Sequence, residues 1–224
     1  LYMGIGGTDT LDIPSVHFVA QVSCVGCHTH LTSQGEPLAH QAKKEDQRAS
    51  CIACHGPGRE LMFDNWIDGT AKVVADYRKY LAAAKATAGK LGGSKTQSTL
   101  LQRAISTAET GFAFIEESHM SHNISYSLYL LNSNAERIAV AMTSIQPGVK
   151  TPQVGASILP ENSCLTFCHS KTLFPEEVSY KGKKLPHAMH AIESELGCKS
   201  CHSISEHGKT QIDKSACADC HEDT

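Results

Sequence analysis

The sequence predicts a mainly α-helical chain with much irregular loop, and three observations support this fold class. Apolar residues recur with a helical period through residues 66–145, which contain no cysteine. All ten cysteines lie on either side of that stretch. Aromatic residues make up only 6% of the 224 residues, so an ordinary apolar core is expected to be thin. Helices are therefore expected in the middle of the chain, and another kind of interaction has to organise its two ends.

The ten cysteines form five units, in each of which a pair of thiols is followed at once by a histidine. Four units have the spacing Cys-x-x-Cys-His, the attachment motif of c-type haem, and one has an additional residue between the thiols. In such a unit both thiols bond to the porphyrin, and the adjacent imidazole ligates the iron. The units are Cys24/Cys27/His28, Cys51/Cys54/His55, Cys164/Cys168/His169, Cys198/Cys201/His202 and Cys217/Cys220/His221.

Disulfides or zinc knuckles are the simpler interpretations of these pairs, but they leave the histidine after each second cysteine unexplained. With 13 histidines in 224 residues, five such coincidences have a chance probability on the order of one in a million under the motif logic. We therefore expect five covalent haems c per chain and no structural disulfide. At the widened Cys164/Cys168 unit, a disulfide or a single-thiol haem is the alternative.

The motif-bearing ends of the chain resemble the multihaem c-type cytochromes, in particular the compact modules of class III and their relatives. The resemblance covers residues 1–60 and 160–224. It implies irons with two histidine ligands each, haems stacked closely enough for electron transfer, and a fold built around them. A helical insertion would interrupt such a fold in the middle.

Taken in order, the chain is expected to comprise a two-haem segment (1–60), a helical insertion without haem attachment (61–147) and a three-haem segment (148–224), together forming one compact unit. Residues 1–23 are expected to be extended or loop-like, with a short strand in the alternating run 16–24. The chain should turn directly after His55, because the sequence Gly-Pro-Gly does not continue a helix.

Three apolar stripes predict the helices of the insertion. The first runs from Val73 to Ala84, the second from Leu100 to Ile115, and the third from Ile124 to Met142. Glycines at 89–93 and Pro147 mark two of the ends. We expect a helical hairpin plus a third helix, and after it a loop with a short hairpin before Pro186.

Eight histidines outside the five units can supply the second axial ligand of each iron. Our choice is His17, His122, His187, His190 and His207, with His30, His40 and His119 in reserve. His187 and His190, three apart, are expected at the start of a helix. Met120 and Met189 each lie between two candidate histidines, and we expect neither to ligate iron because histidines are in excess.

One of these histidines carries a second resemblance. His122-Asn123, followed by Tyr126 and two leucines, is similar to the His-Asn helix start of nitrite reductase and hydroxylamine oxidoreductase-type multihaem proteins. There the matching histidine is a distal haem ligand, which implies this role for His122. For Asn123, capping the following helix is the alternative to a role at the haem.

The ligand supply favours electron transfer by five bis-histidine haems over catalysis. A reductase needs an open iron and acid–base groups around it, and the sequence contains no Cys-x-x-Cys-Lys unit of the nitrite reductase kind. A reductase of small nitrogen or sulfur oxyanions is the second hypothesis. The third is a homo-polymer, a wire of haems in which His17 ligates the iron of a neighbouring subunit.

Charge and hydropathy exclude other classes. The net charge of −3 gives no broad basic face for nucleic acid, and no apolar run is long enough for a transmembrane segment. The chain starts at Leu1 without a signal peptide, so we expect a processed form of an exported protein. The resemblance implies a periplasmic or extracellular location, with redox proteins or extracellular electron acceptors as partners.

Overall fold

The computed structural model describes residues 1–8, 10–28, 40–57, 60–159, 163–169, 175–194, 196, 198–203, 209–210, 212, 217–218 and 221. The chain divides into two compact units, Leu1–His169 and Ser170–Thr224. The first unit thus combines the expected two-haem segment, the helical insertion and the third attachment unit. This division differs from the three segments inferred from the motifs, and the described structure is mainly helical, as expected.

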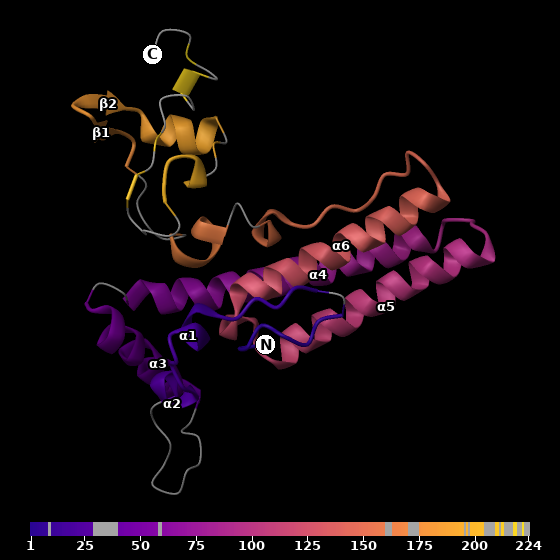
Figure 1. The fold of residues 1–224 in the computed structure, drawn as a ribbon, viewed down its shortest axis with the longest axis horizontal. Coiled ribbons are helices and arrows are strands. Elements are labelled where there is room, and N and C mark those ends of the chain that lie inside the picture. Colours follow the sequence, from indigo (N-terminus) through magenta and orange to yellow (C-terminus); the bar gives the residue numbers. More distant parts are fainter. Residues whose placement is uncertain are drawn as a thin grey trace, which may run out of the picture. The chain divides into compact units, whose positions relative to one another are not determined.

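Three long helices form the body of the first unit: α4 (Glu60–Ala88), α5 (Lys95–Glu117) and α6 (Ile124–Ile145). They run up and down beside one another, and α5 and α6 form the closest pair (Figure 1). Their shared core includes Tyr77, Leu81 and Ala84 of α4, Ala108, Phe112 and Ile115 of α5, and Leu128, Leu131, Ile138 and Met142 of α6. The three predicted helices are confirmed, and their apolar stripes face the core, except that Leu100 at the start of the second stripe is exposed.

Local sequence explains where these helices begin and end. Ser94 and Gln97 form a reciprocal capping box at the start of α5. Asn123 caps α6, since its Oδ1 accepts a hydrogen bond from the Tyr126 backbone N–H at 3.1 Å. The sequence left open whether Asn123 caps this helix, and the structure confirms the cap. Helix α4 ends at Ala88, directly before the glycine-containing turn that leads into α5.

The N-terminal part of this unit contains α1 (Val16–Val19), α2 (Cys24–Cys27) and α3 (His40–His55). The expected strand at 16–24 is wrong. Ser15, after Pro14, accepts a hydrogen bond from the Phe18 N–H at 3.1 Å and so starts a helical turn. Helix α3 ends at His55 and Gly56 follows with φ +81°, which confirms the predicted turn.

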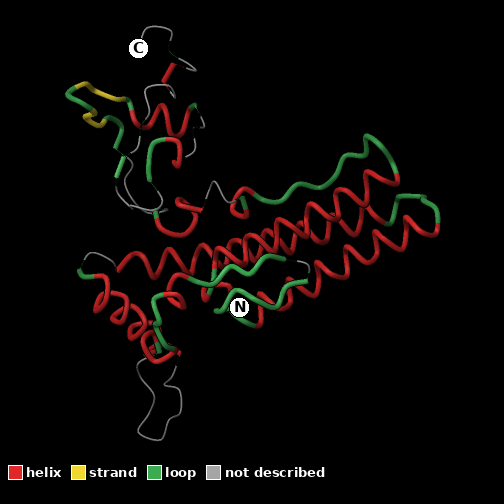
Figure 2. Tube along the Cα trace, viewed as in Figure 1, coloured by secondary structure: helices red, strands yellow, loops and turns green. Residues whose placement is uncertain are grey.

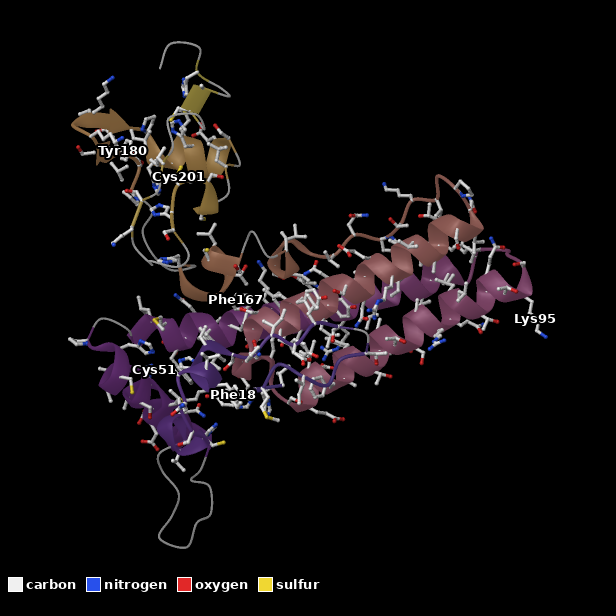
Figure 3. The ribbon with its side chains drawn as sticks, viewed as in Figure 1. Phe18, Cys51, Lys95, Phe167, Tyr180 and Cys201 are labelled. Atoms are coloured by element: carbon white, nitrogen blue, oxygen red, sulfur yellow. The ribbon has the colours of Figure 1, made fainter. Side chains whose placement is uncertain are left out.

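The third attachment unit lies on a π-helical turn, η4 (Cys164–Cys168), which packs against α4. Phe167 of η4, labelled in Figure 3, is only 2% exposed. A Cβ added at Gly69 of α4 would lie 2.7 Å from the Phe167 ring and 2.5 Å from the Thr166 carbonyl oxygen. Only glycine permits this close approach, which fixes Cys164 and His169 to the helical body.

The second unit has less regular structure (Figure 2). Strands β1 (Val178–Tyr180) and β2 (Lys183–Leu185) pair antiparallel around Lys181 and Gly182, which have φ values of +49° and +78°. Short helical turns follow at η5 (Met189–Glu193) and η6 (Cys198–Ser200). The predicted hairpin is confirmed. In the described part of both units, no helix is long and apolar enough to cross a membrane.

Candidate haem-binding sites

The described residues bring histidines of the attachment units together with spare histidines. Each of four close ring pairs joins one histidine that follows a cysteine pair to one of the distal histidines chosen from the sequence. The pairs, with their ring-centroid distances, are His28–His122 at 6.2 Å, His55–His17 at 6.1 Å, His202–His187 at 6.2 Å and His221–His190 at 6.0 Å.

These distances match the spacing of two imidazoles on one metal ion. With metal–imidazole bonds of about 2.0–2.1 Å and about 1.1 Å from nitrogen to ring centre, two opposed ligands have centroids about 6.3 Å apart. Packed rings in direct contact take any separation from about 4.5 to 7 Å. Four pairs between 6.0 and 6.2 Å therefore fit a shared iron.

The first pair, His28 and His122, joins the end of α2 to the turn η1 (Met120–His122) before α6. His122 Nδ1 lies 2.7 Å from the Ser118 carbonyl oxygen, and Gln47 Nε2 lies 3.2 Å from His28 Nδ1. Both imidazoles are exposed. The ring of His122 is thus held by its Nδ1 while its Nε2 remains available for a metal.

The second pair, His55 and His17, joins the last residue of α3 to the short helix α1. The ring of Trp66 lies 6.4 Å from that of His17, and its Nε1–H donates to the Ser121 carbonyl at 2.9 Å. Burial and the neighbouring His55 lower the pKa of His17. His17 is therefore neutral at neutral pH, which is the form that binds a metal.

The third and fourth pairs lie in the second unit. His187 and His190 are three residues apart, yet one faces His202 and the other faces His221. His190 Nδ1 lies 2.8 Å from the Pro186 carbonyl oxygen, and His187 Nδ1 lies 3.2 Å from that of Pro175. Metal-binding histidines commonly donate the second ring N–H to such a carbonyl, which fixes the tautomer and the ring orientation.

The thiols of the first two attachment units lie close to one another, since α2 packs against α3. Burial, and then the nearby Cys54 and Cys24, raise the pKa of Cys27, while burial and the nearby Cys27 raise that of Cys51. These thiols form no disulfide. Cys51, labelled in Figure 3, marks this end of the first unit. In the second unit, burial and the neighbouring Cys217 raise the pKa of Cys201.

The donor set fits haem better than zinc. Among the residues that the structure describes, no group of three or more His, Cys, Asp or Glu side chains is arranged to hold a metal ion. A structural zinc site takes four protein ligands. Two histidines suffice for a haem iron, because the porphyrin supplies the other four nitrogens.

Part of the predicted ligand set lies outside the described residues: His207, Cys220, His30, and the side chains of Cys168 and His40. The ligand opposite His169 is therefore not assigned. The His119 ring lies 6.1 Å from that of His122, a contact that their spacing of three residues explains, and within the described part of the chain it faces no motif histidine. Met120 is 3% exposed and belongs to the apolar core.

The position of His17 bears on the question of a shared ligand. Its partner His55 belongs to the same chain, so this pair forms without a second subunit. The closeness of the Cys27 and Cys51 thiols brings the first two attachment units together, so that His55 lies within reach of His17. The supporting contacts of Gln47 and Trp66 had no signal in the sequence, because each depends on the meeting of separate segments, whereas Ser118 is only four residues from His122.

Comparison of the chain with protein-family models, with curated proteins and with solved structures finds no match.

Proposed function

We propose that this chain is an electron-transfer protein that holds five covalent haems, each iron ligated by two histidines. The observation that carries the proposal is the set of four imidazole pairs at 6.0–6.2 Å. In every pair one ring belongs to an attachment motif and the other to a histidine outside the five motifs. Packing alone gives no reason for this repeated combination.

The cysteines of the five units would hold the porphyrins covalently, and the paired histidines would supply both axial ligands. Such a group supplies reversible one-electron chemistry at its iron. The chain's own contribution would be to hold two imidazoles at each iron, which would keep water and small substrates away from the metal. The hydrogen bonds from Nδ1 of His122, His187 and His190 to backbone carbonyls hold the rings in place.

The arrangement of the attachment units suits transfer between neighbouring sites. Cys27 lies close to Cys51 and Cys54 in the first unit of the fold, and Cys201 lies close to Cys217 in the second. Groups attached at such neighbouring thiols would be near enough to exchange electrons. Each compact unit would then contain a coupled pair of haems.

The proposed location is the periplasm or the cell exterior, and the proposed partners are redox proteins or extracellular electron acceptors. Assembly into a homo-polymer is compatible with this function. It would not use His17 as the shared ligand, because His17 lies beside His55 of its own chain.

Mass spectrometry and spectroscopy of the purified holoprotein test the proposal. We expect a mass increase equal to five haems, electron paramagnetic resonance signals of low-spin iron only, and no rapid binding of carbon monoxide after reduction. A mass corresponding to four haems would contradict the five-haem assignment. A high-spin signal together with nitrite-dependent turnover would favour an enzyme of small nitrogen or sulfur oxyanions.

A further inference from the structure

Asn123 makes contacts that link two of the proposed haem sites. Asn123 is 2% exposed, and its amide oxygen and both of its N–H groups form hydrogen bonds. Oδ1 accepts from the Tyr126 N–H at 3.1 Å, while Nδ2 donates to the carbonyl oxygens of Ile13 at 2.7 Å and Leu1 at 3.3 Å. One amide therefore caps α6 and at the same time binds two points of the N-terminal segment.

These two points belong to a folded loop, residues 1–8 and 10–15, which we call the N-terminal arm. The Ile13 N–H donates to the Gly4 carbonyl at 3.0 Å, and the Ser15 N–H donates to that of Tyr2 at 3.2 Å. Gly4 has φ +71°, and a Cβ added there would lie 1.9 Å from the Ile13 carbonyl oxygen. The two limbs of the arm are thus in close contact, and Asn123 binds one carbonyl on each limb.

Tyr126, on the first turn of α6, holds the middle of the same arm. Its hydroxyl accepts from the Gly7 N–H at 2.7 Å and lies 3.2 Å from the Thr10 hydroxyl oxygen. Tyr126 is fully buried. The start of α6 therefore binds the arm through two side chains, those of Asn123 and Tyr126.

The two distal histidines of the first unit lie next to this contact, one on each of the two segments that it joins. His122 immediately precedes Asn123, and its ring faces His28. His17 follows the arm by two residues, at the helical turn that Ser15 caps, and its ring faces His55. A change at Asn123 can thus reach the His122 ring through one peptide bond, and the His17 ring through the hydrogen bond to Ile13 and the four residues that follow it.

We propose that Asn123 is a positioning residue that couples the first two haem sites, by fixing His122 for one and the His17-bearing arm for the other. The inference rests on the proposed function. Asparagine can form all three of these hydrogen bonds because its amide both accepts and donates. Aspartate retains the oxygen that caps the helix but cannot donate to the two carbonyls. Serine also caps a helix but is too short to span both limbs.

The test compares Asn123→Asp with the control Asn132→Asp in the holoprotein. Asn132 lies on the same helix and also donates from Nδ2 to two carbonyl oxygens, those of Leu128 and Ile158. Both variants therefore lose two donated bonds and add one negative charge, but only one of them touches the arm. The readouts are haem count by mass spectrometry, amide hydrogen exchange of the arm, and low-spin resonance signals.

Asn123→Asp should retain five haems, accelerate exchange of the Gly7 and Ile13 amides by about tenfold or more, the equivalent of 1.4 kcal/mol, and shift the signals of two haems. Variants His17→Ala and His122→Ala identify those two signals, since each removes one ligand. Asn132→Asp should leave the arm and both signals unchanged. Faster exchange with unchanged signals, or a shift of only one haem, overturns the coupling.

Where Asn123→Asp does not fold, Tyr126→Phe decides the arm's part in the inference. It removes the hydroxyl that binds Gly7 and Thr10 while keeping the cap of α6. The signal of the His17 site should shift and that of the His122 site should stay; no shift overturns the inference. A chain that carries no haem in any variant contradicts the proposed function instead, and mass spectrometry separates this outcome from the others.

Discussion

Replacing His122 by alanine tests the ligand assignment against its nearest alternative, His119. The two histidines are three residues apart around the turn η1, and both are exposed. Among the residues that the structure describes, His122 rather than His119 faces a motif histidine, with its ring 6.2 Å from that of His28. His119→Ala is therefore a matched control, since it removes the same side chain from the same turn.

The magnitude follows from the number of attachment units. Five units give five irons per chain, and His122→Ala removes one ligand from one of them. One fifth of the iron should become high-spin or water-ligated, and one carbon monoxide should bind per reduced chain. The lost hydrogen bond to the Ser118 carbonyl should destabilise the fold by only about 1 kcal/mol, so the chain should still fold.

Quantitative electron paramagnetic resonance and carbon monoxide titration of the two purified variants provide the assay. His119→Ala should retain five low-spin irons and bind no carbon monoxide. Five low-spin irons in His122→Ala would refute the assignment of His122. A high-spin iron in His119→Ala would show that His119 is the ligand. The rings of His28 and His122, 6.2 Å apart, would then not share an iron.

Three further variants test the fold that positions the sites. His119 has φ +54°, a backbone conformation that is strained for non-glycine residues, so His119→Gly should be more stable than His119→Ala by about 1 kcal/mol in urea unfolding. Ser157→Ala should cost about 1–2 kcal/mol at pH 7, because the Ser157 hydroxyl, 2.8 Å from Asp76 Oδ2, lowers the pKa of Asp76. A lowered folded-state pKa stabilises the fold above the unfolded pKa and this contribution is lost in acid; the variant and wild type should therefore converge near pH 2, and an equal difference at both pH values would contradict this cause. Ile138 is fully buried in the bundle, so Ile138→Ala should lower the free energy of unfolding by about 2–5 kcal/mol. An unchanged urea midpoint would show that the core does not depend on this side chain.

Interactions between near neighbours in the chain were predictable from the sequence. The spacing of thiols and histidine in the five units is local chemistry, and the apolar stripes at 66–145 reflect the period of the helix itself. The hairpin at Val178–Leu185 follows from a two-residue turn containing Gly182. The N-terminal run was predicted wrongly, because the cap by Ser15 outweighed the alternation of apolar residues.

The sequence also provided the set of spare histidines, but it contained no information on which ring meets which motif. His28 and His122 are brought together by the path of the intervening helices, and neighbouring His187 and His190 face different partners. The roles of Asn123 and Trp66 likewise depend on contacts between distant segments. Helical period and motif spacing are set by bonds within a few residues, whereas the pairing of imidazoles is set by the packing of the whole unit, and only the tertiary structure decides it.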